Sequence, residues 1–214
     1  MTPDRHIVIG MTGNLGAGKS TVGRIAGELG ARVIDSDQTV RDLLANDPEL
    51  SVSIERAFGA EVMAGDRPER AALARIVFND PAALARLEEL IYPRVGERTA
   101  ELLAEPTDAP ATVIEAIKIV EGPNVGRLDA LWIVVATPEI QIQRATASGR
   151  ITATEARRRL AVQSSVDDKE RLFVARRPRC PVWRIENRAD VHALRQRVAA
   201  VWRETLAYRD DPTP

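Results

Sequence analysis

Residues 13–20 have the sequence Gly13-Asn14-Leu15-Gly16-Ala17-Gly18-Lys19-Ser20, which matches the phosphate-binding P-loop pattern G-x-x-x-x-G-K-[ST]. Before this loop, the apolar run at 6–11 predicts a buried strand, and after it residues 20–29 carry apolar side chains at helical spacing. A strand, a glycine loop and a helix in this order are the context that the motif requires. The motif therefore predicts nucleoside triphosphate binding; the alternative is a glycine-rich turn that occurs by chance.

The residues of this loop have separate expected roles. Glycines let backbone N–H groups turn inward and bind phosphate oxygens, and the N-terminus of the following helix adds its positive dipole. The Lys19 ammonium can reach the β- and γ-phosphates, and the Ser20 hydroxyl can bind Mg²⁺. We expect the triphosphate-binding segment to comprise Gly13, Asn14, Leu15, Gly16, Ala17, Gly18, Lys19, Ser20 and Thr21.

Composition limits the class of protein. The chain has 214 residues, of which 44% are hydrophobic and 29% charged, as in an ordinary globular domain. The formal net charge of −1 gives no global basic field for nucleic acid, and no apolar run approaches the length of a membrane span. One cysteine, Cys180, excludes an internal disulfide and fits a reducing compartment. We expect a cytoplasmic enzyme without nucleic-acid or membrane partners, as a monomer or weak homo-oligomer.

Strand and helix patterns alternate along the rest of the chain. Further strands are predicted at 31–35, 111–117, 131–136 and 182–185. Helices are predicted at 37–45, 50–58, 71–78, 81–103 with an interruption at Pro93, 138–147, 152–163 and 189–208. Such alternation implies right-handed crossovers and an α/β fold, a five-stranded parallel sheet covered by helices on both faces.

The spacing of these elements also predicts a domain organisation. We expect one domain over 1–214, with its core at about 5–45, 110–140 and 181–208. The helical stretch at about 46–105 is too long for one crossover and predicts an insertion that binds a second substrate. The arginine-rich stretch at about 141–180 predicts a helical lid.

Two carboxylates follow the second predicted strand, in Val33-Ile34-Asp35-Ser36-Asp37. Ligands of open α/β sheets bind outside the carboxyl ends of the strands, so these groups are expected near the γ-phosphate. One carboxylate can accept the proton of an attacking hydroxyl, and the other can hold Mg²⁺ through water. The alternative for Asp37 is an N-cap of the following helix.

Further motifs follow in a fixed order after residues 12–21 and 33–37: Arg70-Ala71-Ala72-Leu73, Ile76-Val77-Phe78, Leu87-Glu88, Tyr92-Pro93, Gln143-Arg144, Arg159-Leu160-Ala161-Val162-Gln163 and Ile185-Glu186-Asn187. In this order and spacing the chain resembles the dephospho-coenzyme A kinase family, with its Thr-Gly-Gly-Ile-Gly-x-Gly-Lys-Ser loop and Ile-Asp-x-Asp strand end. The resemblance extends from residue 6 to about residue 206.

The resemblance implies a P-loop kinase fold that transfers phosphate from ATP to the ribose 3′-hydroxyl of dephospho-CoA. It implies that Asp37 is the general base, that Lys19 and the loop amides hold the phosphates, and that Arg144 approaches the transferred group from the lid. ATP and Mg²⁺ are the expected cofactors, with Ser20 binding Mg²⁺ directly and Asp35 through water. Phosphoryl transfer depends on positioning and charge neutralisation, for which these residue types are suited.

Two positions on the expected substrate side depart from the family pattern. Tyr92-Pro93 stands where the family has His-Pro; a tyrosine can donate one hydrogen bond and stack, but it does not bind as a cation. The family's Pro-Leu-Leu-x-Glu corresponds to residues 117–121, which keep the acid as Glu121. We expect these residues to contact dephospho-CoA or a lid arginine, with a solvated loop acid as the alternative for Glu121.

The lid and the last strand supply the remaining expected contacts. A second family arginine has no counterpart at the same position, and Arg150 lies one or two positions beyond it. Arg159 and Gln163 match the family pattern one helical turn apart, although a run of arginines there also fits a solvated helix face. Asn187 is expected in the adenine-side loop, with a helix N-cap as the alternative.

Two other functions stay open at this point. One is a P-loop kinase for another small acceptor, such as a nucleoside monophosphate or a metabolite alcohol. The other is a regulatory protein that binds ATP without transferring phosphate. The strand end at 33–37 and the pattern at 159–163 argue against the first. Five residues present together argue against the second: Lys19, Ser20, Asp35, Asp37 and Arg144.

Overall fold

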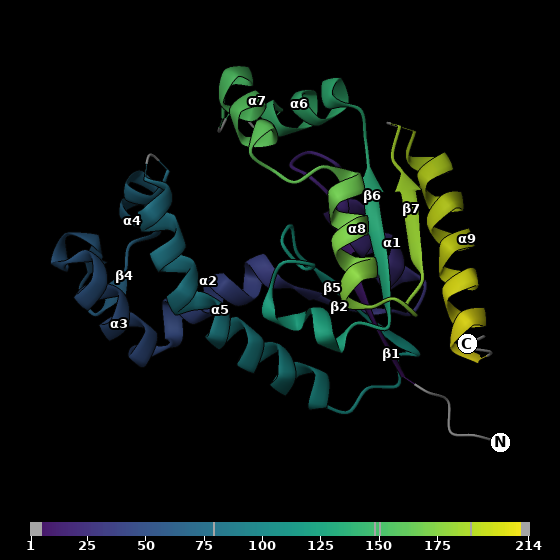
Figure 1. The fold of residues 1–214 in the computed structure, drawn as a ribbon, viewed down its shortest axis with the longest axis horizontal. Coiled ribbons are helices and arrows are strands. Elements are labelled where there is room, and N and C mark those ends of the chain that lie inside the picture. The colour runs from purple at the N-terminus through teal and green to yellow at the C-terminus, as the bar shows by residue number, and fades with distance from the viewer. Residues whose placement is uncertain (1–5, 79, 148, 150, 189, 211–214) are drawn as a thin grey trace. The chain divides into compact units, whose positions relative to one another are not determined.

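The computed structural model describes residues 6–78, 80–147, 149, 151–188 and 190–210. The chain forms two compact units. The sheet unit comprises Met1–Ile34 and Thr107–Pro214, and the helical unit comprises Asp35–Pro106. Figure 1 shows the elements of both units along the chain.

A five-stranded parallel sheet is the centre of the sheet unit. Its order is β2-β5-β1-β6-β7, and β1 pairs in parallel with both β5 and β6 while β6 pairs in parallel with β7. The strands are β1 (Ile7–Thr12), β2 (Arg32–Asp35), β5 (Ala111–Glu115), β6 (Ala130–Val135) and β7 (Val182–Glu186). The predicted strand number and parallel arrangement are confirmed.

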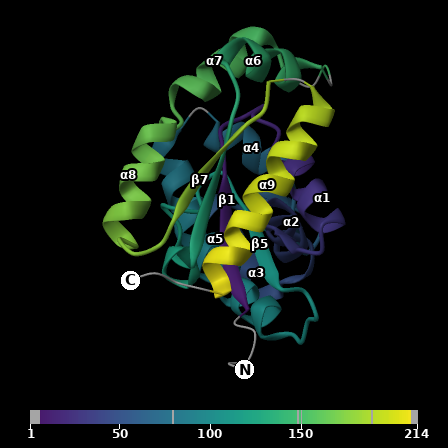
Figure 2. The ribbon, with the colours of Figure 1, turned by 90° about the vertical axis from the view of Figure 1, so that its right-hand side faces the viewer.

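Helices cover both faces of this sheet. The helices of this unit are α1 (Lys19–Glu28), α6 (Pro138–Thr146), α7 (Ala153–Ala161), α8 (Val166–Arg176) and α9 (Val191–Asp210), with a short 3-10 helix η2 (Pro123–Arg127). Helices α1 and α9 pack together on one face and α8 packs on the other, as the two views in Figures 1 and 2 show. Helices α6 and α7 lie beyond the carboxyl end of β6 (Figure 1). The three-layer α/β fold is therefore confirmed.

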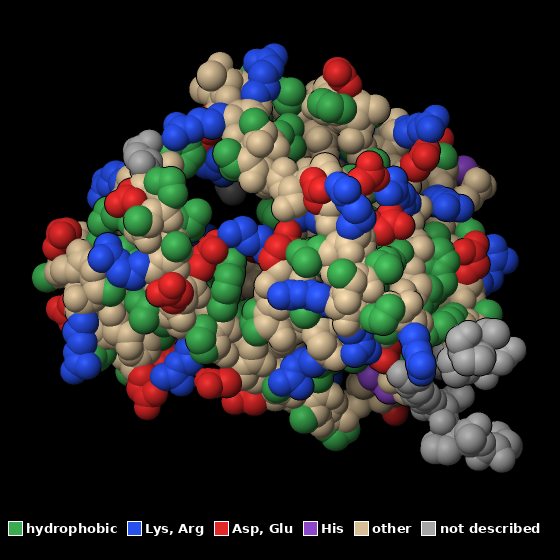
Figure 3. Space-filling view, viewed as in Figure 1, with side chains coloured by type: hydrophobic (Ala, Val, Ile, Leu, Met, Phe, Trp, Pro, Cys, Tyr) green, Lys and Arg blue, Asp and Glu red, His purple; other side chains and the backbone are tan. Residues whose placement is uncertain are grey.

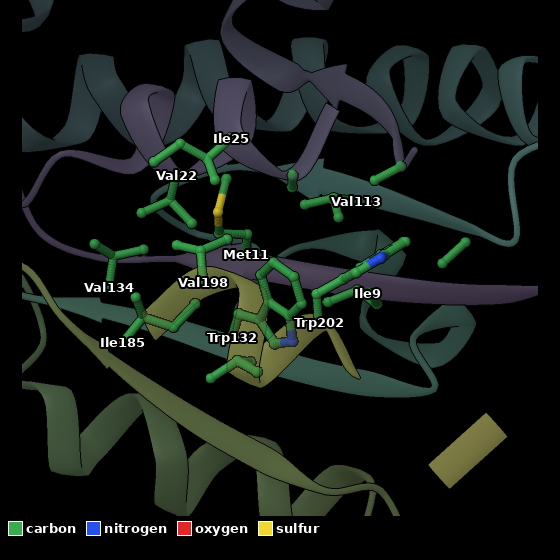
Figure 4. Packing of buried hydrophobic residues seen from close by; sticks show 14 of the residues in the cluster. Ile9, Met11, Val22, Ile25, Val113, Trp132, Val134, Ile185, Val198 and Trp202 are labelled. Atoms are coloured by element: carbon green, nitrogen blue, oxygen red, sulfur yellow. The ribbon is translucent and has the colours of Figure 1, made fainter. Parts of the chain in front are cut away.

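The main core lies between the sheet and the helices α1 and α9. Trp132 of β6 is fully buried there, and its ring lies 6.3 Å from that of Trp202, edge to face (Figure 4). The indole Nε1–H of Trp132 donates to the Thr205 hydroxyl at 3.1 Å. The same hydroxyl donates to the Val201 carbonyl, so both buried polar groups are satisfied.

Helix α8 was not predicted as a helix. Its start has the capping pattern Ser165-x-x-Asp168, in which the Asp168 N–H donates to the Ser165 hydroxyl oxygen. Hydrogen bonds from the Ser165 hydroxyl and then the Arg171 guanidinium lower the pKa of Asp168 below its ordinary value. Phe173 faces inward and is fully buried. The capping pattern could have indicated the start of α8. The helix itself was missed because its many charged residues obscure the helical spacing of its apolar residues.

The helical unit has a core of its own. Its elements are α2 (Ser36–Asn46), α3 (Pro48–Phe58), η1 (Ala60–Val62), β3 (Met63–Ala64), β4 (Arg67–Pro68), α4 (Arg70–Val77) and α5 (Pro81–Ala104). The short antiparallel hairpin β3–β4 was not predicted, because two-residue strands give no periodic signal. The core is formed mainly by Leu44, Leu50, Ile54, Phe58, Val62, Leu73, Ile91 and Val95.

The predicted interruption at Pro93 is wrong. Helix α5 continues from Pro81 to Ala104 with Pro93 inside it. A proline removes one backbone hydrogen bond and strains the preceding turn. Ile91 and Val95 are buried on either side of Pro93, and α5 packs against α2, α3 and α4. Tertiary packing on both sides of the proline therefore outweighs its local cost.

Acidic and basic side chains are interspersed over the face shown in Figure 3, in keeping with the net charge of −1. Apolar side chains are scattered between them on this face (Figure 3). No helix among the described residues has both the length and the apolar character that a membrane span requires.

Two buried threonines provide a matched test of core polarity. We expect Thr205→Val to lower the free energy of unfolding by about 1–3 kcal/mol, because it leaves the buried Trp132 N–H without an acceptor. Thr99→Val is the control, since the Thr99 hydroxyl is equally buried and has no hydrogen-bond partner among the described residues. Chemical denaturation should show no loss of stability for Thr99→Val; equal losses for the two variants would contradict the assignment.

Candidate active site

The P-loop joins β1 to α1, and two of its glycines have conformations that other residues rarely adopt. Gly16 and Gly18 have φ values of +73° and +94°. A Cβ atom on Gly16 would lie 2.2 Å from the Gln141 carbonyl oxygen, and one on Gly18 would lie 2.2 Å from the Asn187 Nδ2. Neighbouring groups therefore approach the loop so closely that only glycine fits at both positions.

Lys19 and Ser20 lie at the N-terminal end of α1. The Lys19 Nζ donates to the Gly13 carbonyl at 3.0 Å, so its side chain spans the loop. The N-cap residue Gly18 has no side chain that would compete with an anion for the positive end of the helix. Thr21 follows in the first turn of α1. This arrangement has the backbone donors and the cation that phosphate groups require.

Glu115 lies beside Ser20 and was not predicted as a candidate site residue. The Ser20 hydroxyl donates to the Glu115 Oε1 at 3.1 Å. The predicted strand ran to residue 117 and placed Glu115 inside it, whereas β5 ends at Glu115. The missed signal was an acidic residue directly after an apolar run, at the edge of the sheet where ligands of such folds bind.

The carbonyl of Ala17 anchors the middle of the loop. It accepts a hydrogen bond from the Asn187 Nδ2 at 2.9 Å and one from the Arg144 Nη1 at 3.3 Å. The Arg144 Nη2 also donates to the Asn187 Oδ1 at 2.9 Å. Arg144 of α6 and Asn187 after β7 are therefore brought together at the P-loop, as residues of one hydrogen-bonded cluster.

The N-cap alternative for Asn187 is wrong. Asn187 is only 3% exposed, and its backbone N–H donates to the Val135 carbonyl at the end of β6. Helix α9 begins at Val191, and the Asp190 carboxylate accepts from the His192 N–H in its first turn. The Asn187 side chain instead supports the P-loop and Arg144.

The segment after α7 holds the beginning of the loop. The Leu15 N–H donates to the Gln163 Oε1 at 2.9 Å, and the Asn14 Nδ2 donates to the Ser164 carbonyl at 3.3 Å. Gln163, which was expected to contact the substrate or the lid, thus contacts the P-loop backbone. Ser164 adds a contact that was not predicted.

Within the helical unit, Asp35 and Asp37 have different local roles. The Asp35 side chain is the N-cap of α2 and accepts from the N–H groups of Asp37 and Gln38 at 2.8 and 3.1 Å. The N-cap alternative for Asp37 is therefore wrong, because the cap lies two residues earlier. The Asp37 side chain is exposed in the first turn of α2, directly after the strand β2.

The other predicted residues lie at several places. In α5, Tyr92 is half-buried and Pro93 exposed. Arg159 donates to Glu155 on its own helix, α7. The Glu121 Oε1 accepts from the Ser164 hydroxyl at 3.3 Å. Arg150 lies outside the described residues.

The P-loop follows β1 of a parallel sheet in the order β2-β5-β1-β6-β7, and an arginine of a following helix lies at the loop. These features define a P-loop kinase. A shikimate kinase from Acinetobacter baumannii has the same fold (TM-score 0.54, 18% identity, 95% of each chain covered). TT1252 from Thermus thermophilus is more similar, with a TM-score of 0.73 and 32% identity over 94% of this chain and 98% of its own.

The family follows from sequence similarity. The family model described as dephospho-CoA kinase matches residues 7–177. A curated dephospho-CoA kinase from Geobacter metallireducens is 36% identical over 203 residues, which cover 94% of this chain and 97% of the relative. The chain belongs to the dephospho-CoA kinase family, and the resemblance inferred from its motifs is confirmed.

Gly16→Ala tests whether close packing against α6 shapes the loop. We expect the dissociation constant for ATP to rise by about tenfold or more, because the new Cβ must displace the Gln141 carbonyl. Gly65→Ala is the control, since Gly65 has a similar φ of +67° and its Cβ would meet no described heavy atom within 4 Å beyond its chain neighbours. Gly65→Ala should cost about 1–2 kcal/mol of stability with ATP binding unchanged. Titration calorimetry and denaturation measure both quantities, and unchanged ATP binding in Gly16→Ala would contradict the prediction.

Proposed function

We propose that this chain transfers the γ-phosphoryl group of ATP to the ribose 3′-hydroxyl of dephospho-CoA and forms CoA, the last step of CoA biosynthesis. The observation that carries the proposal is the anchored P-loop with Arg144 beside it, in a chain of the dephospho-CoA kinase family. Cys180, the lone cysteine, fits a reducing compartment, and we place the enzyme in the cytoplasm as a monomer or weak homo-oligomer.

The P-loop would bind the phosphates of ATP. The backbone N–H groups of residues 13–21 and the Lys19 ammonium supply donors and positive charge. Arg144 would neutralise charge on the transferred phosphoryl group, for which its fork of N–H donors is suited. Asn187 would orient Arg144 and border the nucleotide, since its amide already binds both Arg144 and the loop. Pre-positioned donors of this kind stabilise the transition state without reorganisation during the reaction.

The donor set near α1 suits Mg²⁺. The Ser20 hydroxyl and the Glu115 carboxylate supply two hard oxygen ligands 3.1 Å apart, and Mg²⁺ prefers oxygen ligands while keeping several waters. We propose that Ser20 and Glu115 hold the ion directly, with Asp35 contacting its waters. Bound Mg²⁺ would neutralise the charge of the β- and γ-phosphates.

Asp37 would act as the general base. As the 3′-hydroxyl oxygen bonds to the γ-phosphorus, the bond from that phosphorus to the β–γ bridging oxygen breaks and ADP leaves. The Asp37 carboxylate accepts the hydroxyl proton in this step. Its exposure, and the capping of α2 by Asp35 instead, leave the Asp37 carboxylate available for this task.

The remaining predicted residues would serve the acceptor and the lid. We propose one kinase domain over 1–214 with a substrate-binding insertion at about 46–105 and a lid at about 141–180. Tyr92, Pro93 and Glu121 would contact dephospho-CoA, and Arg150, Arg159 and Gln163 would belong to the lid. Within the lid segment Phe173 of α8 is fully buried, so α8 would stay packed on the sheet during closure.

A panel of acceptors tests the reaction. With Mg-ATP and the purified protein, we expect ADP release with dephospho-CoA and not with AMP, CMP, a metabolite alcohol or no acceptor. A coupled ADP assay measures this directly. Turnover with another acceptor alone would indicate a different small-molecule kinase, and ATP binding without any turnover would indicate a regulatory protein.

Asp37→Asn tests the general base. The amide keeps the size of the side chain but does not accept the proton, so we expect kcat to fall by about 10²–10⁴-fold with ATP affinity unchanged. The control is Asp42→Asn, which neutralises another exposed carboxylate of α2. Equal kcat values for the two variants would contradict the role of Asp37.

A further inference from the structure

Lys169 of α8 is a buried cation that the proposed mechanism does not use. The residue is 1% exposed. Its Nζ donates to the Ile117 carbonyl at 2.8 Å and lies 3.5 Å from the Glu121 Oε1. Burying an ammonium group is costly unless it is paired and hydrogen-bonded, so this position requires both contacts.

The partners of Lys169 lead back to the P-loop from two sides. The Ile117 carbonyl also accepts from the Thr12 hydroxyl at 2.7 Å, and Thr12 directly precedes Gly13. On the other side, the Glu121 Oε1 accepts from the Ser164 hydroxyl, and the Ser164 carbonyl accepts from the Asn14 side chain. These contacts form a chain from Thr12 through Ile117, Lys169, Glu121 and Ser164 to Asn14, and the backbone of Gly13 closes it into a ring, the Lys169 ring.

The first residue of the P-loop, Gly13, is the backbone link that closes the ring. Gly13 lies between Thr12 and Asn14, and its carbonyl is the acceptor of the Lys19 Nζ. A displacement of Thr12 or Asn14 would therefore move the Gly13 backbone, whose carbonyl holds the Lys19 ammonium. Backbone donors bind phosphate well only when they are correctly placed, because misplacement by about 1 Å can cost 10²-fold in rate.

We propose that Lys169 is a positioning residue that fixes the beginning of the P-loop for ATP through the Ile117 carbonyl and the Glu121 carboxylate. The proposal rests on the proposed function, because a fixed loop matters for a bound triphosphate. Stability alone does not account for the pair, in which the Lys169 side chain is 1% and the Glu121 side chain 28% exposed. Replacing a largely buried ion pair by apolar side chains is often neutral or stabilising. The Glu121 Oε2 is also buried without a hydrogen-bond partner among the described residues, which makes the pair a poor device for stability.

Lys169→Met is the first variant. Methionine keeps the length of the side chain and removes its charge, so we expect the dissociation constant for Mg-ATP, measured without acceptor, to rise about tenfold. Arg171→Met is the matched control, because it removes a cation from the same helix at a side chain that is 76% exposed. Arg171→Met should leave ATP binding unchanged.

The double variant Lys169→Met/Glu121→Leu separates positioning from stability. It removes both charges, so the melting temperature should return toward that of the unsubstituted protein even where Lys169→Met alone unfolds. ATP affinity should stay reduced, because the ring remains broken. Recovery of both stability and ATP affinity in the double variant, or unchanged affinity in folded Lys169→Met, would overturn the proposal. Since no acceptor is present, failure here is distinct from failure of the dephospho-CoA reaction.

Discussion

The carbonyl oxygen of Ala17 is the acceptor around which the site is organised. It accepts hydrogen bonds from the Asn187 amide, which directly follows β7, and from the Arg144 guanidinium of α6. These contacts require the loop to pass very close to both elements, and that approach excludes a Cβ atom at Gly16 and Gly18. One backbone carbonyl thus connects the glycine pattern, the sheet order and the position of Arg144.

Most of the expected chemistry of this loop is carried by backbone groups whose placement is set by the fold. Such donors need no rearrangement when charge develops on a phosphoryl group, so their effect depends on how firmly the loop is held. The loop is held at its middle through Ala17 and at its beginning through Leu15 and the Gln163 side chain. Side chains far from the P-loop in the sequence are therefore expected to contribute to phosphate binding.

The sequence was sufficient to predict the features that have a periodic pattern or a motif. Five strands, the P-loop and the family could be predicted, and Arg144 was expected near the transferred group because it matched a family motif. Glu115 was missed because the strand end could not be located to within two residues. Helix α8 was missed because its charged residues masked its buried face, and with it Lys169. The continuity of α5 through Pro93 depends on tertiary packing, which no local pattern reports.

The position of the new phosphate tests directly whether this anchored P-loop serves phosphorylation of dephospho-CoA. Purified protein would be incubated with Mg-ATP and dephospho-CoA, and the product examined by ³¹P NMR together with mass spectrometry. We expect one added phosphate, a monoester on the ribose 3′-oxygen, and ADP in equal amount. A phosphate at another position, or ADP formed without a phosphorylated acceptor, would contradict this expectation.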